Sequence, residues 1–256
     1  MRDGASRAHV TAARTEGSMI TLYSFPGRGP IPSASPFCVK LEAYMRMTKR
    51  EFRTVVPKRP DKAPKGKLPY IEDNGRVIAD SGFVIEYLKK TYGDPLDGDM
   101  SATDQAVAHA FRRLFEEDFY WVMVHARWFD ESNWPEAKKQ IFGEMPLLAR
   151  LIAPGIVRKS LRKQITGHGM GRHSQEEIYK IGVEDLRAAS AFLADKRYFM
   201  GDRMRTIDAT VYPFVASVLW STGSSSMKSE AAKLANLKPY CERLHQEVFG
   251  KALSAG

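Results

Sequence analysis

The chain has 256 residues, 43% apolar and 27% charged, a mixture typical of a globular protein with a sizeable core. No apolar run reaches about 18 residues, so we expect no transmembrane helix. The formal net charge of +9 is compatible with nucleic acid, an anionic membrane or an anionic small ligand, and two cysteines are too few for a disulfide framework, which indicates a reducing compartment.

The first segment, residues 1–18, differs from the rest of the chain. It is rich in Ala, Arg, Thr, Gly and Ser, shows no periodicity, and has no apolar stretch of the kind found in secretory signals. We expect a disordered extension there, followed at once by the first strand.

The first strand is predicted over residues 19–25, where β-branched and aromatic residues alternate. A loop over residues 26–34 contains three prolines and two glycines. Ser35 and Pro36 then form a strong helix start, with serine at the N-cap and proline at the first helical position. The segment therefore predicts a strand, a loop and a helix.

A second strand is predicted over residues 51–56, and a hairpin over residues 68–79 with its turn at Asn74-Gly75. Asp80-Ser81 then opens another helix, with Ser81 as the expected N-cap. These elements complete a small α/β domain over residues 19–93.

A polar, turn-rich linker leads into a domain without strand patterns, over residues 101–250. Ser101 with Asp104 resembles a capping box at the start of a long helix, and further helices are expected at about residues 136–148, 156–165, 175–194, 208–220 and 237–249. The sequence predicts an all-α second domain.

Two other clusters have simple interpretations. The basic residues Arg158, Lys159, Arg162 and Lys163 recur at helical spacing, and we expect them to share a solvated face. No Cys and His residues have the spacing of a zinc site, and we expect no metal.

The strongest chemical signal is Ser35 with Cys38 at the strand–loop–helix junction. The unpaired N–H groups and the dipole of a helix N-terminus favour negative charge. A Ser35 hydroxyl could donate to a bound thiolate, and a Cys38 thiol could itself ionise more easily there. Local sequence alone favours a simpler interpretation, in which Ser35 is only a cap and Cys38 a core residue.

Two further segments are candidate binding sites. Pro69 heads a strand and suits a rigid turn, so the backbone of Leu68 could pair with an extended peptide. At Asp80-Ser81 the helix start could bind a carboxylate, and Asp80 could accept from an ammonium group. An edge proline and an ordinary cap are the alternatives.

These motifs, taken in order, resemble the thioredoxin-like domain of glutathione transferases. The stretch S-A-S-P-F-C-V-K-L-E-A-Y-M-R-M from Ser33, with K-G-K-L-P-Y-I-E-D-N-G from Lys65, is similar to the subgroup that includes metaxins and failed-axon-connections proteins. The resemblance covers about residues 19–249. It implies a thioredoxin-like N-terminal domain and an all-helical C-terminal domain.

The resemblance implies a role for glutathione as co-substrate. Ser35 takes the place of the first cysteine of the glutaredoxin C-P-Y-C motif and Cys38 that of the second, so a serine-type thiol activation fits better than mixed-disulfide chemistry. Ser33 competes with Ser35 because the loop is long. Leu68 would pair with the cysteinyl backbone of glutathione, Lys67 would meet the glycyl carboxylate, and the γ-glutamyl end would lie at Asp80 and Ser81.

In the second domain, Tyr120 and Trp128 are candidates for the pocket of a small hydrophobic electrophile, because the corresponding transferase helix lines that pocket. Aromatic residues at helical spacing more often belong to the core, and that is the alternative. Thr206-Ile207-Asp208-Ala209 resembles the motif that caps the central helix. Arg205 replaces the usual Ser or Thr, which puts the cap in doubt, and Asp208 is expected to be structural.

The implied function is thiol activation by a cytoplasmic, homodimeric detoxification enzyme. The alternative is a non-catalytic interaction module of the metaxin kind with the same fold. A nucleic-acid binder would rest on net charge alone, and no motif supports it.

Overall fold

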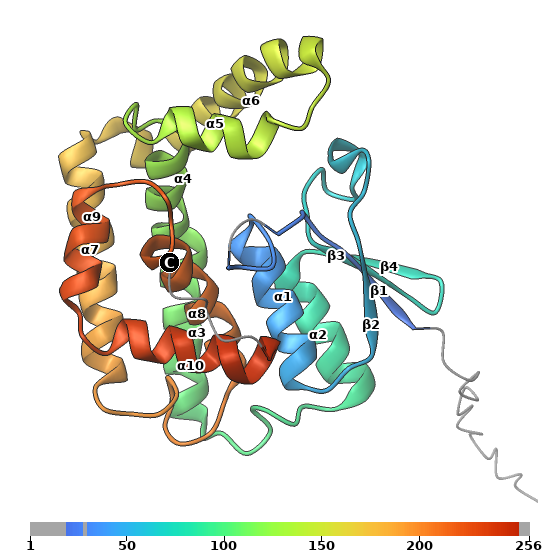
Figure 1. Ribbon diagram of the computed structural model, residues 1–256. Coiled ribbons are helices and arrows are strands. Elements are labelled where there is room, and N and C mark those ends of the chain that lie inside the picture. Colours follow the sequence, from blue (N-terminus) through green and yellow to red (C-terminus); the bar gives the residue numbers. More distant parts are fainter. Residues whose placement is uncertain (1–18, 28–29, 251–256) are drawn as a thin grey trace, which may run out of the picture.

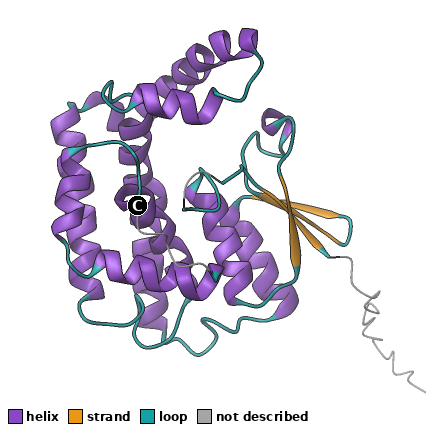
Figure 2. Ribbon diagram, in the orientation of Figure 1, coloured by secondary structure: helices purple, strands orange, loops and turns teal. Residues whose placement is uncertain are grey.

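The computed structural model describes residues 19–27 and 30–250 (Figure 1). The extension expected at residues 1–18 lies outside the described residues. Within them, a small sheet with two helices adjoins a larger helical domain (Figure 2). The expected order of an α/β unit followed by an all-helical unit is confirmed.

The N-terminal domain has a four-stranded mixed sheet in the order β2-β1-β3-β4. Strands β1 and β2 are parallel, whereas β1–β3 and β3–β4 are antiparallel. Its elements are β1 (Ile20–Tyr23), α1 (Pro36–Met47), β2 (Phe52–Val55), a 3₁₀ turn (Pro60–Lys62), β3 (Tyr70–Asp73), β4 (Arg76–Ala79) and α2 (Ser81–Tyr92).

Helices α1 and α2 lie between the sheet and the helical domain (Figure 1). Leu22 and Ile71, one residue from each central strand, are fully buried in one cluster with Leu41, Tyr44 and Val84 from the two helices. Burial of these side chains provides the hydrophobic driving force that holds the helices to the sheet.

The elements of the second domain are all helical. They are α3 (Ala102–Arg113), a π-helical segment (Leu114–Phe119), α4 (Tyr120–Trp128), α5 (Trp134–Phe142), α6 (Leu147–His168), a 3₁₀ turn (Met170–Arg172), α7 (Gln175–Leu193), α8 (Thr206–Leu219), α9 (Ser226–Lys233) and α10 (Leu237–Phe249).

The helical domain differs from the sequence prediction in three places. The long first helix contains a π-helical segment, α6 begins at Leu147 and continues through Pro154, and α9 was not expected. Pro154 is buried inside the helix, where a proline removes one backbone donor and its ring crowds the carbonyl of residue 150. The expected helix over residues 136–148 is therefore divided between α5 and the start of α6.

The central helix α8 is buried along its length, and its start is capped despite Arg205. The fully buried Asp208 accepts hydrogen bonds from the backbone N–H groups of Arg205 and Phe199 and from the Tyr240 hydroxyl, each at 2.8 Å. Because the cap uses the backbone N–H of residue 205, an arginine there is tolerated. Asp208 has the expected structural position.

The basic cluster on α6 is largely solvated, as expected. Lys159, Arg162 and Lys163 are exposed, whereas Arg158 is half-buried. Arg158 packs over the Trp134 ring at 4.5 Å, and Arg162 lies over an aromatic ring at the end of α4 at the same distance.

Candidate functional site

The sheet brings three distant segments to one edge. In the register of the strands, Tyr23 is paired with Tyr70, and Tyr70 with Ala79. The end of β1, the start of β3 and the end of β4 therefore lie side by side. The loop that leads into α1, the Leu68-Pro69 dipeptide and the Asp80-Ser81 dipeptide extend from these strand ends.

Ser35 is the N-cap of α1, as the sequence predicts, with extended backbone angles. Within the described residues its side chain makes no capping hydrogen bond, and it is half-buried. The Ser35 backbone N–H donates to Ser33 Oγ at 3.3 Å, and Ser33 is buried. The two serines therefore lie together beside the positive end of the helix dipole, with the Ser35 hydroxyl the more accessible.

Cys38 lies in the first turn of α1 and is fully buried. Burial raises the pKa of its thiol, although hydrogen bonds from the Phe25 backbone and from neighbouring hydroxyls, including that of Ser24, act in the opposite direction. A thiol in this state is mostly protonated at neutral pH, which disfavours a nucleophilic role.

The Leu68–Pro69 peptide bond is cis, and both residues are buried. Neither the N–H nor the C=O of Leu68 pairs with another backbone group of the described residues. These two groups lie just before the first paired residue of β3, where an added extended chain could use them. Lys67 is exposed beside them.

Asp80, and not Ser81 as expected, is the N-cap of α2. Its Oδ1 accepts from the Gly82 N–H at 2.9 Å, and its backbone has φ = 81°. A non-glycine residue with positive φ is uncommon, and Asp is among the residues that tolerate it best. Asp80 is exposed at the start of the helix, whereas Ser81 is buried as the first helical residue.

The buried ammonium of Lys40 lies behind Ser81. Its Nζ is 3.2 Å from Ser81 Oγ and 2.5 Å from Glu116 Oε1 on the π-helical segment. Burial lowers the pKa of Lys40, and the charge of Glu116 counteracts that effect. Because Lys40 can only donate, Ser81 Oγ is the acceptor and its own proton remains available to a ligand.

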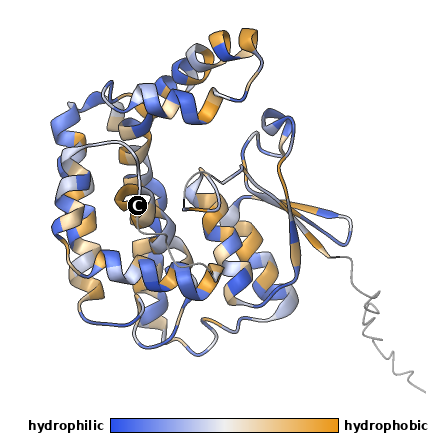
Figure 3. Cartoon of the chain, viewed as in Figure 1, coloured by the Kyte–Doolittle hydropathy of each residue, from blue (hydrophilic) through white to orange (hydrophobic). Residues whose placement is uncertain are grey.

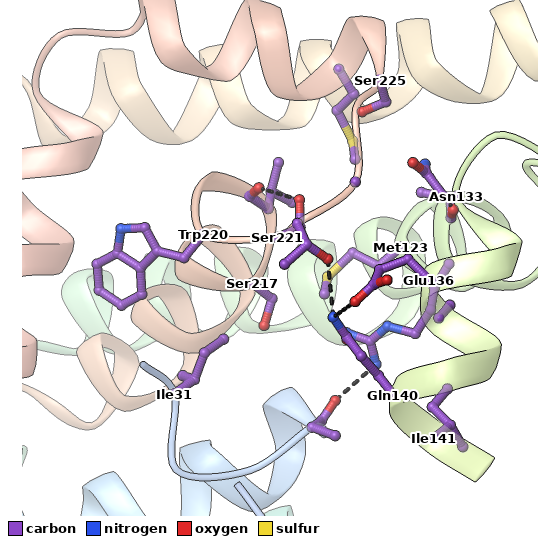
Figure 4. Close-up of a pocket in the computed structure, with 18 of the residues that line it drawn as sticks. Ile31, Met123, Asn133, Glu136, Gln140, Ile141, Ser217, Trp220, Ser221 and Ser225 are labelled. Atoms are coloured by element: carbon purple, nitrogen blue, oxygen red, sulfur yellow. Dashed lines mark hydrogen bonds between the residues drawn. The ribbon is translucent and has the colours of Figure 1, made fainter. Parts of the chain in front are cut away.

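A cavity of about 300 Å³ opens next to Ser33 and Ala34, between the loop before α1 and the helical domain (Figure 4). Its walls come from α4, α5, α8 and the segment after α8, and include Ile31, Met123, Ala126, Ala137, Ile141, Val218 and Met227. A cavity of this size with mainly apolar walls suits a small hydrophobic molecule.

Arg127 is the basic residue that lines this cavity. Its Nη1 donates to the Ala34 carbonyl at 2.8 Å, which ties α4 to the loop before Ser35. Burial lowers the pKa of Arg127. No carboxylate of the described residues forms an ion pair with Arg127 (the pairs involve other residues), so its remaining N–H groups are available to a ligand in the cavity.

The two aromatic residues expected in the electrophile pocket do not line this cavity. Tyr120 packs edge-on against Phe37, with ring centroids 5.1 Å apart, and Trp128 packs against Trp134 at 5.6 Å. The cavity is lined instead by three other residues of α4, Met123, Ala126 and Arg127. They lie on the side of the helix that faces the loop before α1. Helical periodicity alone could not identify which face that was.

Sequence reasoning also missed Glu116 and Arg127 as parts of the site. Glu116 contacts Lys40, 76 positions earlier in the chain, and Arg127 contacts Ala34, 93 positions earlier. Their only sequence signal is a charge within an otherwise apolar helical stripe.

No group of three or more His, Cys, Asp and Glu side chains in the described ranges has the arrangement of a metal site. None of the helices described here combines the length and the hydropathy needed to cross a bilayer.

Two family models match the chain. One, described as the glutathione S-transferase N-terminal domain, matches residues 36–133, and the other, the glutathione S-transferase C-terminal domain, matches residues 182–244. Together they include α1 at the front of the site and the helices behind it.

Three curated proteins are similar over most of this chain. The isoprene-epoxide glutathione S-transferase of Rhodococcus sp. strain AD45 is 34% identical, over 90% of this chain and 99% of that protein. Failed axon connections of Drosophila melanogaster is 29% identical, over 84% of this chain and 53% of that protein. Human metaxin-1 is 27% identical, over 97% of this chain and 56% of that protein. The chain thus spans about half the length of the last two.

Among solved structures, a glutathione S-transferase of Ceriporiopsis subvermispora in complex with glutathione has a TM-score of 0.62 to this fold. It is 19% identical, over 93% of this chain and 99% of that chain. This likeness supports the two-domain transferase fold.

Proposed function

The chain belongs to the glutathione S-transferase family, and from that membership we propose that it activates the thiol of glutathione for attack on a small hydrophobic electrophile. One observation supports this most directly: Ser35, the unpaired backbone of Leu68 and the N-terminus of α2 lie at one sheet edge, next to an apolar cavity. Glutathione is an extended tripeptide with a thiol, two carboxylates and an ammonium group, and these three elements complement it.

In this proposal the sulfur lies at Ser35. The Ser35 hydroxyl donates to it, and the dipole at the start of α1 favours its negative charge, so the thiol pKa falls. Ser33 and Cys38 are the alternative partners. Cys38 and Ser33 are disfavoured because both side chains are buried, 0% and 2% exposed.

The rest of the tripeptide follows the sheet edge. The cysteinyl backbone pairs with Leu68 ahead of Pro69, and the glycyl carboxylate meets Lys67. At the other end, the γ-glutamyl carboxylate binds Ser81 and the free N–H groups of α2, and the ammonium binds Asp80. The ammonium of Lys40 behind Ser81 adds positive charge where this carboxylate would lie.

The cavity beside Ser33 would hold the electrophile, and Arg127 suggests what kind. The Rhodococcus relative is named for an epoxide. When a thiolate attacks an epoxide carbon, a C–S bond forms, the C–O bond breaks, and the oxygen takes up the electron pair and then a proton from water. The free N–H groups of Arg127 would stabilise the negative charge that develops on such an oxygen.

Calorimetry with glutathione tests the proposal, on the wild type and on Ser35→Ala, Cys38→Ala and Asp80→Ala, followed by a chromogenic conjugation assay. We expect the wild type to bind and Asp80→Ala to bind more weakly. Ser35→Ala should bind but conjugate slowly, and Cys38→Ala should keep most of the rate. Failure of the wild type to bind millimolar glutathione would refute the enzyme and favour the metaxin-like interaction module.

A further inference from the structure

The outer side of α6 carries a cluster of exposed apolar side chains. The exposed fractions are 75% for Leu148, 60% for Ile152 and 64% for Ile156, and Leu147, Leu151 and Met145 beside them are also exposed. Of the eleven large apolar residues that are exposed in the described ranges, these six fall within twelve consecutive positions. Exposed apolar patches on this scale mark interaction sites.

The apolar row continues into lysines. Leu148, Ile152, Ile156, Lys159 and Lys163 follow one another at spacings of three or four, so they share one face of the helix. On the opposite face, Pro154 and Ile165 are buried, whereas Leu147 and Leu151 at the free end of the helix are exposed. Figure 3 shows the apolar bands at the free end of α6, which lies with α5 at the upper end of the molecule.

The charge around this face is strongly one-sided. Residues 134–168, from α5 to the end of α6, contain seven Lys or Arg residues and two Glu residues, a formal charge of +5. Helix α6 itself contains no Asp or Glu. Of its basic residues, Arg158 is paired with Glu131 at 2.5 Å, whereas Lys159 and Lys163 are exposed.

We propose that this outer face of α6 docks on an anionic lipid bilayer. A helix whose free end carries exposed aliphatic side chains, with lysines further along the same face, can contact a membrane interface, with the aliphatic groups among the acyl chains and the lysines at anionic headgroups. A second copy of the chain would bring two such positive surfaces together, and nucleic acid would leave the aliphatic row in water. The bilayer is the partner that satisfies both parts of the face.

Vesicle flotation of the full chain tests this, with vesicles of phosphatidylcholine alone and vesicles in which one lipid in three is phosphatidylserine. The matched variants are L148S/I152S and K159E/K163E. The control is V77S on β4, which removes an apolar side chain of similar exposure, 55%, far from α6. Thermal melting and circular dichroism check that each variant is folded.

We expect the wild type and V77S to float with the anionic vesicles and not with the neutral ones, with binding that weakens as salt is added. Each lysine is worth about a factor of five at an anionic surface, so K159E/K163E should bind at least about 25-fold more weakly. L148S/I152S should lose a similar factor. The proposal is overturned if the wild type does not float, or if folded L148S/I152S floats like the wild type. It is also overturned if analytical ultracentrifugation shows a wild-type dimer that L148S/I152S alone disrupts. Retention on DNA that depends on the lysines but not on Leu148 would also overturn it.

Discussion

Lys40 Nζ lies 2.5 Å from Glu116 Oε1, so a buried ammonium of α1 is paired with a carboxylate of the helical domain. The side chains are 1% and 8% exposed. The same ammonium is 3.2 Å from Ser81 Oγ. The contact between the two domains and the proposed γ-glutamyl site therefore share one charged group.

Removing Lys40 should destabilise the fold and weaken glutathione binding together. Lys40→Met leaves the buried Glu116 with Arg112, 3.7 Å away, as its remaining ion-pair partner, so the free energy of unfolding should fall by up to about 3 kcal/mol. Urea denaturation measures the loss. The double variant Lys40→Met/Glu116→Gln removes both charges and should recover much of the stability but not the glutathione affinity, and equal recovery of both would contradict the assigned role.

Substitutions of Asp80 should distinguish its effect on glutathione binding from its effect on the stability of the fold. Asp80→Asn keeps an oxygen that can accept from the Gly82 N–H and tolerates the positive φ, but it loses the charge that faces the ligand ammonium. We expect stability close to wild type and a loss of about 1.5–3 kcal/mol in glutathione affinity. Asp80→Ala should in addition lose about 1 kcal/mol of stability with the cap. Calorimetry and thermal melting distinguish the two, and unchanged affinity in Asp80→Asn would remove Asp80 from the site.

Cys38 should be unreactive at neutral pH. Burial raises the pKa of its thiol, so the thiolate is scarce and the sulfur is also inaccessible. Iodoacetamide at pH 8 should modify the folded protein far more slowly than the protein in urea, as measured by mass spectrometry. Rapid alkylation that glutathione blocks would instead make Cys38 the sulfur-contacting residue.

A substitution of Arg127 should lower the rate of reaction with the electrophile more than it weakens the binding of glutathione. Arg127→Met removes the hydrogen bond to the Ala34 carbonyl and the free N–H groups of the cavity. We expect kcat/KM for an epoxide to fall about tenfold to a hundredfold. The value for an aryl halide should fall much less, because its leaving group is a halide ion and no alkoxide develops. Equal losses for both substrates would indicate that Arg127 only positions the loop.

Asp185 on α7 should make stability depend on pH. Burial raises the pKa of this carboxyl to about 7, helped by Asp118 and Glu184, and its Oδ2 has no hydrogen-bond partner among the described residues. A carboxyl that ionises near pH 7 when folded but near 3.8 when unfolded disfavours the folded state once ionised. Its cost is absent at low pH and grows as the pH rises from about 4 to 7.

Asp185→Asn removes that ionisation. The variant should be more stable than the wild type by about 2–4 kcal/mol at pH 8, and by less at pH 5. Urea denaturation of both proteins at the two pH values checks this. A gain that is the same at both pH values would mean that the carboxyl does not titrate in this range.

Much of the N-terminal domain was predictable because its signals are local. Ser35-Pro36 starts α1, and Asn74-Gly75 forms the turn between β3 and β4. A cap, a turn or an alternating strand depends on a few neighbouring residues, so the sequence displays it directly. The resemblance to glutathione transferases rests on the order of the same signals.

The helical domain was predicted less well at its boundaries. The continuation of α6 through Pro154 and the π-helical segment around Glu116 both depend on tertiary contacts. Periodicity marks a helix but does not say where packing prolongs or distorts it.

The sequence by itself determined the order of the elements and the segments at Ser35, Leu68 and Asp80 that meet at the sheet edge. Only the tertiary structure decided that Cys38 is buried, that Arg127 rather than Tyr120 or Trp128 reaches the cavity, and that Lys40 stands behind Ser81. The physical reason is sequence separation. Caps and turns form between neighbours in the chain, whereas burial and ion pairing depend on residues 40 to 90 positions away, which the chain brings together only when the two domains pack.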